Sequence, residues 1–231
     1  MWKPLWIYTT IIDFDEEFTT NLKKTHYAQA VHQLLQLHTL DKVKKFRMFF
    51  CTGDRYSSDL IEWIEFVKVK GVGELVLDLS GNVRHSNSTD DDDISWCILE
   101  SPHDFKGFKA LISVALYGVT INGVQLGEII HRSPLLEDLT MSYCNSLKDG
   151  EIRTQNLKNL QYKGQVCGNP IFNDVSSINE ATPLLTHDEL DYELHLWQNF
   201  LTKLSHVSSL EVKVTSTHPG HVDDVLLHIW S

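Results

Sequence analysis

Apolar residues recur along this chain in one short spacing, in which two positions lie three residues apart and a third follows two residues later. Leu136, Leu139 and Met141 show this spacing, and Val43, Phe46 and Met48 repeat it. The alternation in its second half is typical of a short β-strand with one buried face. The pattern therefore predicts a series of short strands, each preceded by one additional buried position.

Further copies of the spacing occur between and after these two. They are Val72-Leu75-Leu77, Leu111-Val114-Leu116, Leu157-Leu160-Tyr162 and Val207-Leu210-Val212. The segment 11–14 predicts a further strand at the N-terminal end. In the two best copies a cysteine, Cys51 or Cys144, follows three residues after the last apolar position. The full pattern matches L-x-x-L-x-L-x-x-N/C, the motif of leucine-rich repeats. In that motif the final residue is buried where the chain leaves the strand, so we interpret both cysteines as structural.

The spacing between successive strand centres is uneven. Between Phe46, Leu75, Val114, Leu139, Leu160 and Leu210 the intervals are 29, 39, 25, 21 and 50 residues. Three intervals lie within the usual range of about 20–29 residues. The two longer ones contain a polar, acidic segment at 81–96 and a segment with helical patterning at 187–204. We interpret these segments as a loop insertion and a helical insertion.

Helical patterns occupy several of the segments between the predicted strands. Apolar residues at helical spacing predict helices over 27–37, 57–69 and 124–131, and Pro134 ends the last. Gly71 is a suitable stop for the second helix. The sequence thus predicts an α/β fold in one domain, residues 1–231. This fold is an irregular leucine-rich-repeat solenoid with parallel strands on its concave face and helices on its convex face.

Charge and composition narrow the classes of partner. The formal net charge of −11 disfavours binding to nucleic acid and to anionic membranes. No stretch reaches the roughly 20 apolar residues that a membrane-spanning helix needs, and the first residues lack the pattern of a signal peptide. We therefore expect no nucleic-acid or membrane partner and a cytoplasmic or nuclear location. In such a reducing compartment the four scattered cysteines are expected to be free thiols.

Two groups of residues are the strongest candidates for metal chemistry. His218 and His221 lie near Asp223 and Asp224, but a Pro-Gly turn separates the two histidines, and no further ligand motif completes the group. The four aspartates at 90–93 lack the alternation, central glycine and final glutamate of a calcium loop. The chain also has no phosphate loop, dinucleotide fingerprint or nucleophile elbow. We expect no enzymatic activity, no cofactor and no metal.

Three segments carry a resemblance to a known family. Residues 133–141 read Ser-Pro-Leu-Leu-Glu-Asp-Leu-Thr-Met, which is similar to the phrase C-P-x-L-E-x-L-x-L with serine in place of cysteine. Residues 58–64 and 71–79 resemble a helix-then-strand unit. Residues 1–15, which include Trp2, Trp6 and Asp13, resemble the join just after an F-box. Together and in this order they resemble the plant F-box/leucine-rich-repeat proteins.

This resemblance implies a role as substrate receptor of a cullin-type ubiquitin ligase, in which the repeats hold a protein substrate. In that family the F-box, which docks on the ligase adaptor, precedes the Trp-containing join, and only its last turn is expected here. A second hypothesis is therefore a stand-alone or truncated repeat scaffold, or a decoy that binds the substrate without delivering it to a ligase. The substrate protein is unknown. Binding to the adaptor is expected only if an F-box lies upstream.

The strand positions that point away from the core define the expected binding surface. Between the two inward apolar positions lie Arg47, Val76, Ala115, Thr140, Gln161 and Glu211, and after the second lie Phe49, Asp78, Tyr117, Ser142, Lys163 and Lys213. Our candidate protein-binding residues are Arg47, Phe49, Asp78, Tyr117, Thr140, Ser142, Gln161 and Lys163. Arg47, Phe49, Asp78 and Tyr117 are the expected anchors, because aromatic residues and arginine dominate the binding energy of interfaces.

Overall fold

A computed structural model describes about two thirds of the chain, and every structural statement below refers to that part. The described residues are 5–22, 24–50, 57–80, 97–98, 108–144, 152–153, 156–163, 172–186, 198, 201–215 and 225–229. The acidic loop insertion at 81–96, the histidine pair at 218–221 and most of the predicted helical insertion at 187–204 lie outside these ranges. Of the last segment, residues 198 and 201–203 are helical.

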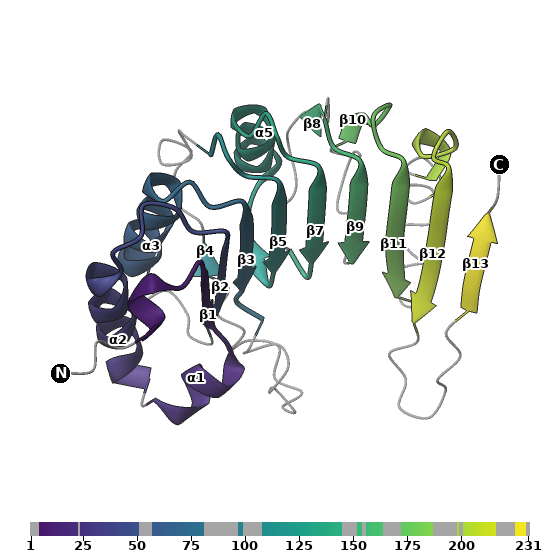
Figure 1. Ribbon diagram of the computed structural model, residues 1–231. Coiled ribbons are helices and arrows are strands. Elements are labelled where there is room, and N and C mark those ends of the chain that lie inside the picture. The colour runs from purple at the N-terminus through teal and green to yellow at the C-terminus, as the bar shows by residue number, and fades with distance from the viewer. Residues whose placement is uncertain are drawn as a thin grey trace.

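A single large sheet organises the described part of the chain (Figure 1). Its strands follow one another in chain order, each beside the next. The first eight are parallel, and the last pairs antiparallel with its neighbour. They are β1 (Ile11–Phe14), β2 (Lys45–Phe49), β3 (Glu74–Asp78), β5 (Ser113–Tyr117), β7 (Asp138–Ser142), β9 (Asn159–Lys163), β11 (Glu180–Thr186), β12 (Ser209–Thr215) and β13 (Val225–Ile229). The predicted α/β class with parallel strands is confirmed.

Helices cover one face of this sheet. The main ones are α2 (Lys24–Leu37), α3 (Ser57–Val69) and α5 (Gly123–Arg132), close to the predicted bounds. Asn122 begins α5 with a capping box, in which its side chain accepts from the Gln125 amide and the Gln125 side chain accepts from the Asn122 amide. None of the helices in the described ranges is long and apolar enough to span a bilayer.

Several shorter elements complete the fold. A 3-10 helix, η1 (Leu5–Tyr8), precedes β1, and a six-residue helix, α1 (Glu16–Asn21), follows it. Two small parallel pairs lie outside the main sheet. They are β4 (Cys97–Ile98) with β6 (Val119–Thr120), and β8 (Ile152–Arg153) with β10 (Phe172–Asp174).

Equivalent apolar positions of successive strands lie side by side in the core. The first inward position aligns Ile12, Phe46, Leu75, Val114, Leu139, Leu160, Ala181 and Leu210, all of which are buried. The additional position three residues earlier is buried as well, at Val43, Val72, Leu111, Leu136, Leu157, Ile178 and Val207. The helices contribute Val31, Trp63 and Leu126 to the same core. The spacing noticed in the sequence therefore marks the core correctly.

Strand β11 is the main difference from the expected set of strands. It lies between β9 and β12, in the 50-residue interval that we attributed to an insertion. Ile178, Ala181 and Pro183 have the required spacing and are buried. Alanine and proline are poor strand formers, so this copy carries no visible strand signal. Its centre, Ala181, lies 21 residues after Leu160 and 29 before Leu210, so the 50-residue interval is two ordinary intervals.

The turn after β5 passes close to the backbone that follows β3. Gly118 has a φ of +63°, and a Cβ placed on it would lie 2.7 Å from the Ser80 Cα and 2.8 Å from the Ser80 nitrogen. Its amide donates to the Ser142 carbonyl at 2.8 Å. Glycine is therefore required here both for the backbone conformation and for space.

The buried residue Ser133 lacks a partner for its hydroxyl. Ser133 follows α5, its backbone N–H donates to the Ile130 carbonyl, and its carbonyl accepts from Leu136. The residue is 2% exposed, and its Oγ has no hydrogen-bond partner. An unsatisfied buried hydroxyl lowers stability.

We predict that Gly118→Ala lowers the free energy of unfolding by about 2–4 kcal/mol, because a left-handed backbone and a contact with backbone atoms of Ser80 add together. Urea denaturation followed by circular dichroism measures the change. Gly73→Ala is the matched control, because its added Cβ would meet the Lys44 carbonyl at 3.4 Å and the Ala110 carbonyl at 3.8 Å, both ordinary contact distances, and its φ is not positive. Equal losses in both variants would contradict the role of Gly118.

We predict that Ser133→Cys raises the free energy of unfolding by about 1 kcal/mol, because the weakly polar thiol does not need the missing hydrogen bond. Ser133→Ala serves as a second variant that removes the hydroxyl without adding volume. A lower urea midpoint in both variants would show that the hydroxyl has a stabilising partner.

Candidate protein-binding face

The sheet face opposite the helices, which we call the open face, carries three rows of strand positions in register. The start row is Lys45, Glu74, Ser113, Asp138, Asn159, Glu180 and Ser209; the middle row is Asp13, Arg47, Val76, Ala115, Thr140, Gln161 and Thr182; the end row is Phe49, Asp78, Tyr117, Ser142, Lys163, Leu184 and Lys213. Neighbouring strands lie about 4.8 Å apart, so each row is a regular line of side chains across the sheet.

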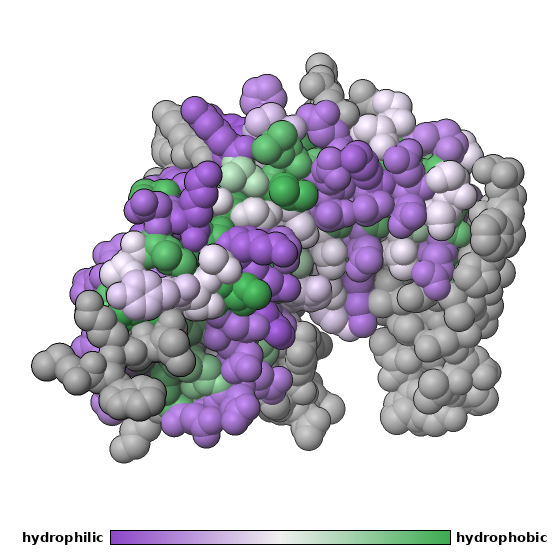
Figure 2. Space-filling view, viewed as in Figure 1, coloured by the Kyte–Doolittle hydropathy of each residue, from purple (hydrophilic) through white to green (hydrophobic). Residues whose placement is uncertain are grey.

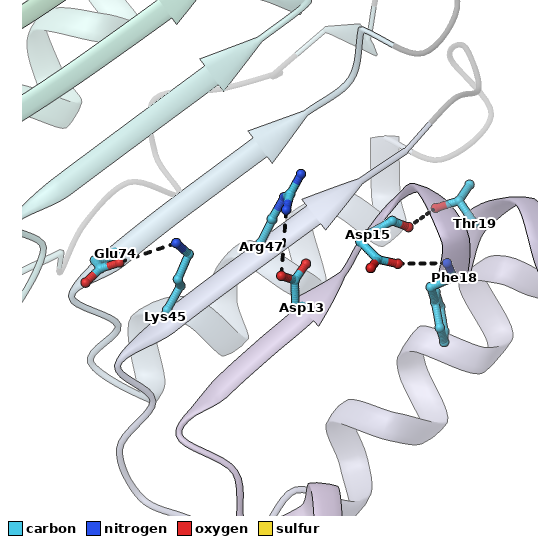
Figure 3. Close-up of polar contacts among 7 residues, drawn as sticks. All are labelled: Asp13, Asp15, Phe18, Thr19, Lys45, Arg47 and Glu74. Carbon is cyan, nitrogen blue, oxygen red and sulfur yellow. Dashed lines mark hydrogen bonds and ion pairs between the residues drawn. The ribbon is translucent and has the colours of Figure 1, made fainter.

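Charged residues of opposite sign face each other at the β1–β3 end of the open face (Figure 3). Arg47 Nη1 lies 3.7 Å from Asp13 Oδ2, and Lys45 Nζ lies 3.6 Å from Glu74 Oε2. The four side chains are 37–40% exposed. Exposed pairs at such distances contribute about 0–1 kcal/mol each. These charged groups are therefore weakly held by one another and accessible to a partner.

The turn from β1 into α1 shapes the lower border of this region. Asp15 caps α1, because its side chain accepts from the Phe18 amide at 2.8 Å and its carbonyl accepts from the Thr19 hydroxyl at 3.0 Å (Figure 3). The Thr19 hydroxyl also contacts the Phe49 carbonyl, at 2.8 Å. The short helix is thereby fixed against the end of β2.

Three of the eight candidate residues are buried. Phe49 is 2% exposed, because α1 and α2 reach the end of β2, where Thr19 and the Tyr27 hydroxyl both donate to its carbonyl. Asp78 is 4% exposed, and its carboxylate accepts from the amide and the hydroxyl of Ser80. The expectation that Phe49 and Asp78 are exposed anchors is therefore wrong.

Ser142 is the third buried candidate, at 8% exposure. Its carbonyl accepts from the Gly118 amide at 2.8 Å and contacts the Cys144 thiol at 3.7 Å. Strand ends are covered by the turns that follow them, so the end row is less accessible than period-two alternation suggests. The turn at Ser80 lies against Asp78 and Cys144 lies against Ser142, whereas Phe49 is covered by α1 and α2.

The other five candidates lie on the accessible part of the open face. Gln161 is exposed, and the remaining four, Arg47, Tyr117, Thr140 and Lys163, are partly exposed. Between Arg47 and Gln161 the middle row has only the small side chains of Val76, Ala115 and Thr140, which are also partly exposed. The centre of the open face is therefore a shallow floor, bordered by an arginine and a glutamine.

Sequence reasoning missed the whole start row and one residue just beyond the strands. Lys45 and Glu74 precede the first apolar position of their strands and face the same side as the middle row. The alternation of apolar and polar positions in the sequence already predicts this orientation. Asp13 was equally visible as the polar residue between Ile12 and Phe14. Tyr143, 37% exposed, follows β7 in a turn, and no periodic pattern identifies it.

The surface of the open face is mostly hydrophilic, as the space-filling view shows over β7 and β9 (Figure 2). By contrast, an apolar hollow of about 710 Å³ lies beside the edge strand β1, where Ile12, Phe14, Phe18 and Leu34 are among its lining residues. The two surfaces differ in chemistry. The open face is suited to polar and charged recognition, and the β1 edge to apolar contact.

The described residues contain no group of three or more histidine, cysteine and acidic residues arranged to hold a metal ion. Cys144 is buried, and its thiol contacts the Leu116 carbonyl at 3.5 Å. Burial raises the pKa of the Cys144 thiol to about 11, so the thiol is protonated at neutral pH. A protonated, buried thiol is a poor nucleophile, which supports the structural interpretation of this cysteine.

Comparison with known proteins gives one informative similarity. The chain is 25% identical to an F-box/FBD/LRR-repeat protein of Arabidopsis thaliana, and the match covers 91% of this chain and 53% of that protein. The chain thus spans about half the length of the curated relative it matches. No family model matches the sequence, and no solved structure matches it. The resemblance to plant F-box/leucine-rich-repeat proteins is confirmed as a sequence similarity that extends over nearly the whole chain.

Proposed function

We propose that this chain is an irregular leucine-rich-repeat solenoid that binds another protein on its open face, which forms the concave side. The observation that carries this proposal is the in-register series of eight parallel strands, which presents three aligned rows of side chains on a face without helices. Repeat proteins use such extended faces to bind partners.

The dimensions and chemistry of the open face support this role. Eight parallel strands at about 4.8 Å each give a face roughly 34 Å wide, comparable with a small protein domain. Arg47 at one border supplies a partly exposed guanidinium, whose Nη1 lies 3.7 Å from the Asp13 carboxylate. The small side chains at the centre leave space for protruding side chains of a partner. We also propose that the chain acts by binding alone, without a cofactor.

The similarity to an F-box/FBD/LRR-repeat protein supports a finer role, which we also propose. In this proposal the chain corresponds to the substrate-recognition part of a ubiquitin-ligase receptor, and it works in the cytoplasm or nucleus. A scaffold or decoy would have the same open face but would not bind the ligase adaptor. A binding experiment with the purified adaptor separates the two roles. Binding of the adaptor by this chain as given would exclude the decoy, whereas its absence combined with substrate binding would support it.

We predict that Arg47→Glu weakens binding of the partner protein at least tenfold, because it reverses a charge at the border of the open face and also places two acids side by side. Arg132→Glu is the matched control, since Arg132 lies on α5, on the helical side of the sheet, and has a similar 3.8 Å contact with Glu128. The partner is first identified by affinity purification from plant extract, and its affinity is then measured by calorimetry with each purified variant.

A second substitution tests the shallow floor. Thr140→Arg introduces a long side chain in the middle row and is expected to weaken the same binding by a similar factor. If both open-face variants keep the affinity of the original chain, or if Arg132→Glu weakens binding equally, the open face is not the binding surface.

A further inference from the structure

Tyr143 has an unfavourable backbone conformation. Its φ is +53°, and among the described residues no other non-glycine residue has a positive φ. In this conformation the Cβ of an L-residue is crowded by its own backbone, so glycine normally occupies such positions. A bulky residue here is an outlier that needs an explanation.

The equivalent position after the preceding strand is Gly118. Both residues immediately follow a strand, both have a positive φ, and both donate their amide to the end-row residue of the next strand. The acceptors are Ser142 for Gly118 and Lys163 for Tyr143, each at 2.8 Å. The turn itself therefore needs only the amide, and glycine satisfies it at β5. A tyrosine at β7 contributes something other than the turn.

The Tyr143 side chain does not fill the core. The residue is 37% exposed, and the Lys163 Nζ lies 4.7 Å from the centre of its ring. This cation–π contact, together with the backbone hydrogen bond, holds Tyr143 and Lys163 as one unit on the surface. Unfavourable backbone conformations that serve no packing role are concentrated at functional sites.

Lys163 carries a positive charge on the open face and has neutral neighbours in the described rows. Its neighbours in the end row are Ser142 and Leu184, and the middle-row residue of its own strand is Gln161, so all three are neutral. Within the described residues no carboxylate lies within ion-pairing distance of its Nζ, in contrast to Lys45 and Lys158. The Lys163 side chain is partly exposed, so an acidic group of a partner can reach its ammonium.

We propose that Tyr143 and Lys163 form a subsite for an acidic segment of the partner protein. This inference rests on the proposed function, because it specifies the partner of the same open face. One carboxylate pairs with Lys163, and an adjacent apolar side chain packs on the Tyr143 ring. The net charge of −11 opposes such a partner only at long range. At physiological ionic strength the screening length is about 8 Å, so the neutral surroundings of Lys163 dominate.

Selection from a phage-displayed library of random 12-residue peptides on the immobilised chain tests this proposal. The selected peptides are expected to be rich in Asp and Glu, with an apolar residue beside one of the acids. A selected peptide is then synthesised with a fluorescent label and titrated with the original chain and with each variant. We expect Lys163→Gln to weaken binding of this peptide at least fivefold. Lys158→Gln, at the other end of the same strand, is the matched control and leaves binding unchanged. Selection of neutral or basic peptides, or of none, overturns the proposal.

Tyr143→Gly separates a binding role from a structural one. It relieves the unfavourable backbone and keeps the amide donor, so the urea midpoint is expected to be unchanged or higher while peptide binding falls at least fivefold. A lower midpoint with unchanged peptide binding overturns the proposal. Failure of this subsite can be distinguished from failure of the proposed function. If Arg47→Glu weakens binding of the partner protein and Tyr143→Gly does not, the open face binds the partner but this subsite does not contribute.

Discussion

The register of the parallel backbone pairing is the constraint on which the rest of the structure depends. Six carbonyls, each just before a strand, accept two successive amides from the entry of the next strand; they belong to Thr10, Lys44, Gly73, Ile112, Glu137 and Lys158. The strand exits are also paired through the backbone. There the amides of Phe50, Leu79, Gly118 and Tyr143 each donate to the carbonyl of the last residue of the next strand. Both ends of the central strands are therefore fixed relative to their neighbours.

The apolar core and this register stabilise each other. A slip of one residue would turn every inward side chain toward solvent. Phe46, Leu75, Val114 and Leu139 form one line in the core only because the backbone pairing keeps them level. The same alignment produces the rows of the open face, so the proposed binding surface is a direct consequence of the way the core is built. Ion pairs such as Lys45–Glu74 and Arg47–Asp13 lie on this framework and do not create it.

Deviations from regularity are concentrated at the strand exits. Gly118 and Tyr143 adopt left-handed conformations there, Asp78 turns its carboxylate toward Ser80, and Cys144 is buried against the Leu116 carbonyl. Asp78 and Ser142 are buried beside these turns, and α1 and α2 bury Phe49 at the end of β2. The turns also place Tyr143 beside Lys163. The strand exits therefore determine how much of the open face a partner can reach.

The sequence alone predicted the core, most of the strands, the three main helices and the middle row of the open face. It did so because leucine-like residues at fixed spacing have only one arrangement that buries them all. It missed β11, because Ala181 and Pro183 carry no strand propensity and are recognised only by the neighbours that pair with them. It also misjudged Phe49 and Asp78, because their burial depends on α1 and on the turn at Ser80, which alternation along a single strand does not contain. The pattern of a strand determines which side a residue faces, whereas only the tertiary structure decides whether that side is covered.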